Sequence, residues 1–146
     1  MSCPSIIGLS SEIGRGHPSY LDSVWTLLER GFPDPASRLS YWKAHDRSVR
    51  TSRLAWSAVA SVYWIGGRGG TTTRLYNILR RRRGVPSRGG LAVGLLGKDV
   101  RAALRGFEGI CLVAHPILAQ IASTVSRTWF IHGEIAAPEE CAVSGV

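Results

Sequence analysis

A glycine-rich turn with one imidazole lies near the start of the chain, between a short apolar segment at 6–9 and a predicted helix. Its residues are Gly14, Arg15, Gly16, His17 and Pro18. Glycines ahead of a helix let backbone N–H groups approach an anion, and the helix dipole favours negative charge there. A histidine in the same turn can act as an acid, a base or a hydrogen-bond donor near neutral pH. The turn is therefore a candidate site for a phosphorylated ligand, with His17 as its candidate base.

The same pattern has a simpler interpretation, which is a tight strand-to-helix turn where His17 only caps the helix. The spacing Gly-x-Gly-His differs from the Gly-x-Gly-x-x-Gly pattern of dinucleotide-binding turns. No acidic residue stands clearly where such a site places its ribose partner. The turn alone leaves both interpretations open.

Two further predicted strands carry a histidine at their carboxyl ends. Residues 109–115 form a continuous apolar run that is typical of a parallel strand buried on both faces, and this run ends at His115. Residues 128–132 form another predicted strand that ends at His132, and Ser10 follows the first strand. Because open α/β sheets bind ligands outside the carboxyl ends of their strands, these residues predict a cleft at that edge.

Hydrophobic periodicity predicts the elements that would position these residues. Residues 18–31 are expected to form a helix because apolar residues recur at helical spacing, with Pro18 at its start and Gly31 at its end. Further predicted elements are a strand at 38–45, a helix capped by Ser52, a helix that starts at 71–73, a helix at 91–107 and a helix that starts at Pro116. The expected buried faces are Trp56, Val59, Ala60, Tyr63 and Trp64 in the helix after Ser52, and Leu75, Ile78 and Leu79 in the next. This order predicts an α/β protein with a mostly parallel sheet.

The positive charge of the chain is concentrated in its middle. The formal net charge is +8, and residues 68–105 hold ten Arg or Lys against one acid, whereas residues 106–146 hold one Arg against four acids. The densest block comprises Arg80, Arg81, Arg82 and Arg83. Such a block can face nucleic acid, anionic lipid or a phosphorylated substrate, or it can be a solvated helix end.

Length and cysteine usage narrow the class of protein. A chain of 146 residues fits one domain, and no apolar run reaches the ~18–20 residues that span a membrane. The first residues lack the basic and long apolar regions of a secretory signal. The three cysteines, Cys3, Cys111 and Cys141, have no metal-ligand spacing, so we expect reduced thiols in a cytoplasmic protein without a metal site. Cys111 lies in an apolar run and is expected to be a core residue.

The order of these features resembles the N-terminal, acceptor-side domain of GT-B glycosyltransferases, above all the monogalactosyldiacylglycerol synthase-like group and, more distantly, the MurG-type transferases. Residues 14–17 are similar to the Gly-rich loop of that family, and residues 113–118 resemble its V-S-T-H-P-type turn. Residues 54–79 are similar to its aromatic-rich helices, and residues 130–134 lie where it has another strand and polar loop. The chain departs from the family in having fewer glycines around Arg15, and in the absence of the Thr-Asp that usually follows the last strand.

The resemblance implies a Rossmann-like three-layer domain that forms one half of a GT-B architecture and spans residues 1–146, with a helical basic insertion at about 50–107. The reaction would be sugar transfer from a nucleotide-sugar, as co-substrate and without a further cofactor, to a hydroxyl acceptor such as a lipid. His17 would be the base, and Gly14, Arg15, Gly16, His115 and Glu134 would bind phosphate or acceptor. The block Arg80–Arg83 would contact anionic membrane at its cytoplasmic face. A donor-binding domain, in cis or in a partner chain, would complete this hexosyltransferase, so the 146 residues alone are expected to be inactive.

Other functions remain open at this point. A non-catalytic basic module that binds nucleic acid or anionic membrane is the main alternative, and a GT-B-fold sugar epimerase is a third. On the residues alone, His115 can instead cap the helix that follows it, and Glu134 can be a solvated loop acid.

Overall fold

The computed structural model describes residues 5–11, 13, 16–81 and 91–132 of the chain. The strands are β1 (Ile6–Ser10), β2 (Leu39–Lys43), β3 (Ile110–Val113) and β4 (Arg127–Phe130). The helices are α1 (Gly16–Gly31), α2 (Pro35–Arg38), α3 (Arg50–Gly66), α4 (Gly70–Arg81), α5 (Leu91–Leu104) and α6 (Pro116–Ala122). The strands form one all-parallel sheet in the order β2-β1-β3-β4. The prediction of an α/β, Rossmann-like three-layer fold is confirmed, with a sheet that is entirely parallel.

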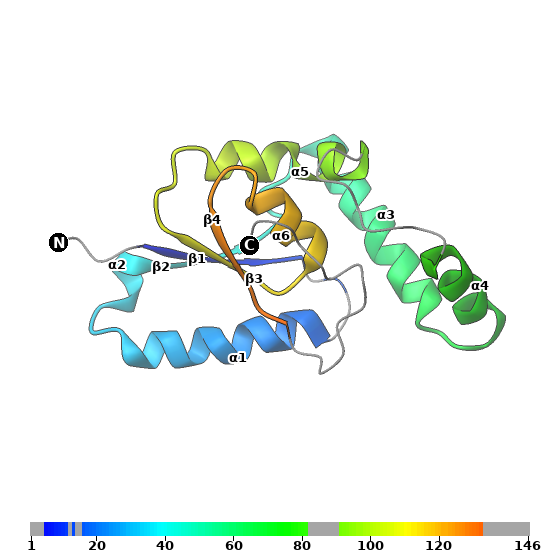
Figure 1. The fold of residues 1–146 in the computed structure, drawn as a ribbon, viewed down its shortest axis with the longest axis horizontal. Coiled ribbons are helices and arrows are strands. Elements are labelled where there is room, and N and C mark those ends of the chain that lie inside the picture. Colours follow the sequence, from blue (N-terminus) through cyan, green and yellow to red (C-terminus); the bar gives the residue numbers. More distant parts are fainter. Residues whose placement is uncertain (1–4, 12, 14–15, 82–90, 133–146) are drawn as a thin grey trace.

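The sheet lies between two layers of helices. Helix α1 covers one face, while α5 and α6 cover the other (Figure 1). Alternate residues of the central strands supply the two cores. Ile6, Leu112 and Ala114 pack with Leu21 and Trp25 of α1. Ile7, Leu9, Cys111 and Val113 pack with Val93, Leu96, Leu118 and Ile121 of α5 and α6. This alternation explains why the strands read as continuous apolar runs, because both of their faces are buried.

Helix α1 is held against β1 and β2 by an aromatic side chain. Gly8 leaves room for the Trp25 ring, since a Cβ at this glycine would lie 2.7 Å from ring carbon Cε3 of Trp25. The same ring meets Tyr41 edge-on with a centroid distance of 5.4 Å. The Tyr41 hydroxyl donates a hydrogen bond of 2.7 Å to Oδ1 of Asp22. These contacts fix the direction of α1 relative to the strand that precedes it.

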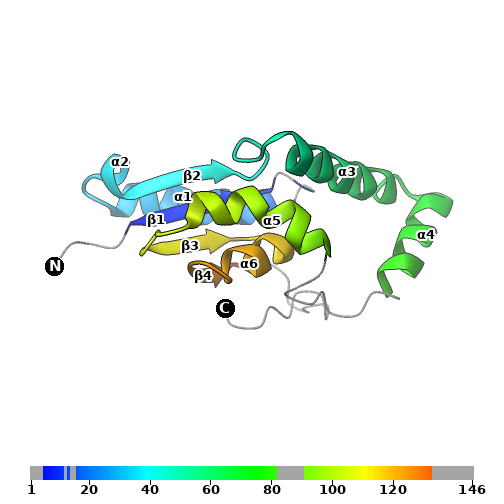
Figure 2. The ribbon, with the colours of Figure 1, turned by 90° about the horizontal axis from the view of Figure 1, so that it is seen from above.

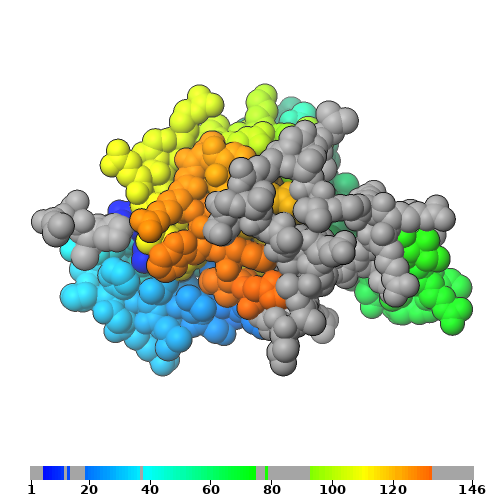
Figure 3. Space-filling model, viewed as in Figure 1, coloured from blue at the N-terminus to red at the C-terminus, as the bar shows by residue number. Residues whose placement is uncertain are grey.

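Helices α3 and α4 together, residues Arg50–Arg81, form a projection that we call the arm. Strands β2 and β3 point towards the arm, which extends beyond their carboxyl ends (Figure 2). In the space-filling view, α4 lies at the far end of the molecule, away from the sheet (Figure 3). Gly69 and Gly70, at φ +91° and +65°, make the turn between the two helices, because these backbone conformations strain other residues.

Three hydrogen bonds attach the base of α3 to α5. The Val49 backbone N–H donates to Oδ2 of Asp99 over 2.9 Å, and the Ser52 hydroxyl donates to the Leu95 carbonyl over 3.0 Å. The Trp56 indole N–H donates to the Leu96 carbonyl over 3.2 Å. Ser52 was predicted to cap α3, and this prediction is wrong. The helix already begins at Arg50, Ser52 lies inside it, and its N-cap residue is Val49, whose backbone N–H donates to a carboxylate of α5.

Several predicted burials and boundaries also differ from the structure. Trp64 and Ile78 were expected to face inward, but both are exposed. At 100° per residue, Trp64 follows the half-buried Tyr63 and falls on the solvent side of α3. The strand expected at 38–45 is shorter, because the Lys43 carbonyl accepts the N–H of Asp46 and a turn begins.

Boundary differences elsewhere have local causes. Helix α5 ends at Leu104 rather than near residue 107, because Gly106 takes φ +80° and the chain turns there. The strands predicted at 109–115 and 128–132 are confirmed in position but are four residues each. In the described part of the chain, no helix combines the length and hydrophobicity that a membrane crossing requires.

Gly109→Ala is expected to lower the free energy of unfolding by about 2–3 kcal/mol, as overpacking of a tight contact does. A Cβ at Gly109 would overlap the Ser5 carbonyl oxygen, which accepts a hydrogen bond from the neighbouring Ile110 N–H. Gly94→Ala is the matched control, because a Cβ there meets no atom of the described residues within 4 Å. This control should raise stability by about 0.5–1 kcal/mol through helix propensity. Urea denaturation of both variants measures the difference, and equal stabilities would contradict the close approach at Gly109.

Candidate functional site

The sheet has a topological switch point between β1 and β3. The chain leaves β1 for β2 on one side, whereas it leaves β3 for β4 on the other side. The intervening helices α1 and α6 lie on opposite faces of the sheet (Figure 1). Where the connections diverge in this way, open α/β sheets bind ligands outside the carboxyl ends of the strands. The fold thus singles out the residues that follow β1 and β3.

Each of the four histidines in the chain follows a different strand at this edge. His45, His115 and His132 each come two residues after the last residue of β2, β3 and β4. His17 lies in the first turn of α1, the helix after β1. Because Leu9 pairs with Val113 and Val113 pairs with Phe130, the strands end at nearly the same level. His45, His115 and His132 therefore lie along one edge of the sheet, and the backbone of His17 belongs to the helix that follows its fourth strand, β1.

His115 is the most deeply buried of the described histidines, with 2% of its surface exposed. It occupies the N-cap position of α6, but its side chain makes no capping hydrogen bond. Its ring instead meets Tyr63 of α3 edge-on, with a centroid distance of 6.0 Å. The arm is thus packed on the carboxyl end of β3. His115 is the N-cap residue of α6, as the simpler interpretation has it, and its carbonyl accepts the N–H of Ala119, but its side chain does not make the capping bond.

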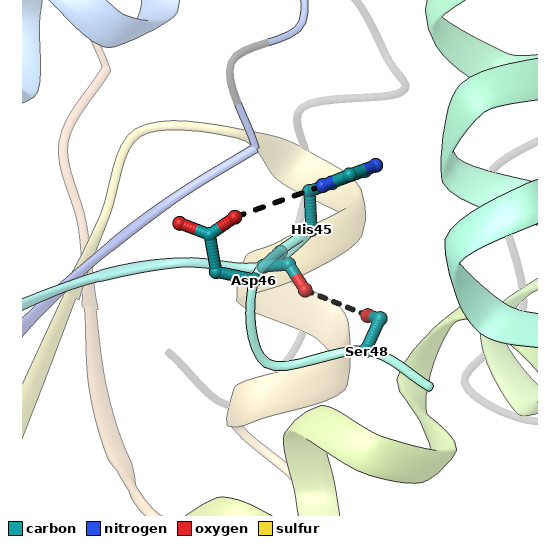
Figure 4. Close-up of polar contacts among 4 residues, drawn as sticks. His45, Asp46 and Ser48 are labelled. Atoms are coloured by element: carbon teal, nitrogen blue, oxygen red, sulfur yellow. Dashed lines mark hydrogen bonds and ion pairs between the residues drawn. The ribbon is translucent and has the colours of Figure 1, made fainter. Parts of the chain in front are cut away.

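The turn after β2 places a second, more accessible imidazole at the edge. The Ala44 N–H donates to the Ser10 carbonyl over 2.8 Å, which extends the pairing of β1 and β2 past their ends. The Ser48 hydroxyl donates to the Ala44 carbonyl over 2.6 Å and closes the turn. His45 extends from this turn with its Nδ1 3.7 Å from Oδ1 of Asp46 (Figure 4). Sequence analysis missed His45 because it placed this residue inside the strand.

The start of α1 has the polarity that suits an anion. The helix begins at Gly16, and its first turn contains no acidic side chain that would neutralise the positive end of its dipole. At 16 residues, α1 is long enough to develop that dipole fully. The predicted strand and helix are confirmed as β1 and α1, although α1 begins at Gly16 rather than at Pro18 as expected. Ile13, which lies between them in the sequence, is buried.

Several predicted site residues lie outside what the structure describes. Gly14, Arg15, Glu134, Arg82 and Arg83 are outside the described residues. Gly16 and His17 belong to α1, and Arg80 and Arg81 belong to α4, but the description of these four residues stops at the backbone. Their roles stay predictions.

Cys111 does not contribute a nucleophile. It lies in the middle of β3 and is fully buried, as predicted for a core residue. Burial raises the pKa of its thiol to about 12, and a hydrogen bond with Ser126 opposes this shift only in part. Because the thiolate is the reactive form, the thiol is inert at neutral pH. Among the described residues, no three His, Cys, Asp or Glu side chains come together as a metal site would require.

Comparisons of the chain with models of protein families, with curated proteins and with solved structures find no match.

Proposed function

We propose that this chain is the acceptor-binding half of a glycosyltransferase that moves a sugar from a nucleotide-sugar to a hydroxyl group. The observation that carries the proposal is the pairing of β1 with β3 at the switch point. The two stretches on which the resemblance to GT-B enzymes rests, residues 14–17 and 113–118, follow these two neighbouring strands. Two stretches roughly 100 positions apart in the sequence are thereby attached to neighbouring strands, which supports one shared site.

The proposed reaction needs a base and a stabilised leaving group. The acceptor oxygen forms a bond to the anomeric carbon while the bond from that carbon to the diphosphate breaks. His17 takes the proton of the acceptor hydroxyl, and the nucleoside diphosphate leaves with the electron pair of the broken bond. The N–H groups at the start of α1 offer partial positive charge for phosphate or acceptor oxygens. Glu134 and His115 contribute to the acceptor side in this proposal.

A second domain completes the proposed enzyme. The nucleotide-sugar is the only co-substrate, and in GT-B enzymes it is held mainly by a separate donor-binding domain. That domain would be in cis or in a partner chain, so this hexosyltransferase half is inactive by itself. A lipid acceptor would place the enzyme peripherally on the cytoplasmic face of a membrane.

The test compares the 146-residue chain with the complete natural protein or complex that contains it. Each is incubated with radiolabelled UDP- and GDP-sugars and with a vesicle-borne lipid extract as acceptor. We expect transfer only from the complete protein. Sugar transfer by the 146-residue chain alone would refute the proposal that the chain is one half of the enzyme. Absence of transfer from both, together with polyanion binding that weakens steeply with salt, would favour the non-catalytic basic module.

A further inference from the structure

Large apolar side chains are exposed mainly on the arm. Among the described residues, the exposed large apolar side chains of the arm are Leu54, Val62, Trp64 and Ile65 of α3 and Ile78 of α4. Leu54 is 72% exposed and Trp64 is 62% exposed. Contiguous exposed apolar surface on a globular domain marks a site of interaction rather than chance exposure.

The apolar residues of α3 form a stripe on the side that faces away from α5. Leu54, Ala58, Val62 and Ile65 recur at intervals of four, four and three residues, and all four are exposed. Ser52 and Trp56, which bond to α5, lie on the opposite side of the helix. A helix that is apolar on all sides is normally buried on all sides. Among the described residues, α5 packs on one side of α3 and α4 contacts it as well, yet the stripe stays exposed.

The arm is also strongly basic. Residues 50–81 contain six Arg and no Asp or Glu. Arg50, Arg53, Arg68 and Arg74 are exposed on the arm. The Arg68 guanidinium lies over the Trp64 ring, 3.5 Å from the ring centroid. An exposed Trp beside Arg groups suits the boundary between lipid headgroups and acyl chains, where amphipathic rings are enriched.

We propose that the arm docks on the surface of an anionic lipid bilayer. The stripe of α3 enters the boundary between headgroups and acyl chains, and the surrounding arginines contact the lipid phosphates. A nucleic acid would match the charge but would leave the apolar stripe without a partner, because protein–nucleic acid interfaces are polar. An acidic protein is the remaining alternative, and it would be favoured if the chain bound neither neutral nor anionic vesicles.

Docking by the arm would have a geometric consequence for the candidate site. The arm extends beyond the carboxyl ends of the strands, and Tyr63 of α3 contacts His115 at one of these ends (Figure 2). A bilayer bound to the arm would therefore lie on the same side of the domain as the histidines. This docking does not depend on the proposed glycosyl transfer, since it would hold for any reaction at the edge.

The test is co-sedimentation of the full chain with vesicles of phosphatidylcholine alone and with 30 mol% phosphatidylglycerol. We expect binding to the anionic vesicles and at least about tenfold weaker binding to the neutral ones, because the arginines contribute electrostatically. The double variant Leu54→Glu/Ile65→Glu should reduce binding to anionic vesicles by at least about tenfold. Leu27→Glu is the matched control, because Leu27 is exposed to a similar extent but lies on α1. Thermal denaturation verifies that each variant is folded.

A second pair of variants tests the charge. Arg53→Gln/Arg68→Gln should weaken binding to anionic vesicles and make it less sensitive to salt, whereas Arg30→Gln on α1 should not. Equal binding of both vesicle types, or equal binding by wild type and the double glutamate variant, would overturn the proposal. A dimer that the glutamate variant dissociates, without any vesicle binding, would instead identify a second copy as the occupant. Because no nucleotide-sugar is present, failure of the transfer assay leaves this result unchanged.

Discussion

His17→Ala is expected to lower the rate of sugar transfer by the complete protein roughly 10²–10⁴-fold, which is the usual contribution of a general base. The proton of the acceptor hydroxyl would then have no imidazole to accept it, while the fold of α1 and β1 stays intact. The transfer assay with labelled nucleotide-sugar measures this loss at saturating donor. Thr26→Ala is the control, because Thr26 is exposed further along the same helix, away from its start.

The pH profile separates this role from a structural one. In the wild type, transfer should rise with pH as the imidazole loses its proton, and His17→Ala should remove that limb of the profile. If His17 is only a residue of the first turn of α1, the substitution should cost no more than about 1 kcal/mol of stability and leave the rate within a few-fold. That outcome would remove His17 from the proposed mechanism.

Trp56→Ala is expected to lower the free energy of unfolding by about 3–5 kcal/mol, as removal of a buried aromatic ring does. The Trp56 side chain is 3% exposed, packs in the larger core, and bonds through its indole N–H to the Leu96 carbonyl. The alanine variant would lose the packing and this link between α3 and α5. Thermal and urea denaturation measure the effect, and a domain of this size should lose roughly 10 °C in Tm.

Trp64→Ala gives a matched comparison on the same helix. Trp64 is mostly exposed and its ring is covered on one side by Arg68, so its removal should cost no more than about 1 kcal/mol. Binding to anionic vesicles should follow the opposite order. Trp64→Ala should weaken this binding more than Trp56→Phe, which is used here because it keeps an aromatic ring in the core and so stays folded. Equal losses of stability for Trp56→Ala and Trp64→Ala would contradict the attachment of α3 described here.

Local sequence was sufficient to predict where most elements lie. The apolar run at 109–115 predicted β3, since a strand covered on both faces needs apolar side chains at consecutive positions. Gly31 and Pro116 marked the end of α1 and the start of α6, because glycine ends helices and proline suits their first turn. The placement of polar residues after β1, β3 and β4 also predicted the edge where the candidate site lies.

Contacts between residues far apart in the chain determine which residues of α3 are bonded and buried, which local sequence does not predict. The carboxylate that bonds the N–H of Val49, the N-cap residue of α3, belongs to Asp99, fifty residues away, so no local pattern around Ser52 could reveal it. Whether Trp56 or Trp64 is buried depends on which side of α3 meets α5. Apolar residues occur on both sides of this helix, so its sequence does not distinguish them.

The sequence by itself thus determined the kinds of element, their order, and the histidines at strand ends, because these follow from side-chain period and turn chemistry within a few residues. Only the tertiary structure decided the strand order, which makes β1 and β3 neighbours and creates the switch point. It also decided that the arm extends past the same edge and leaves one apolar face of α3 exposed (Figure 2). The physical reason is that strand pairing and helix packing are settled by burial between segments far apart in the chain, which no local pattern encodes.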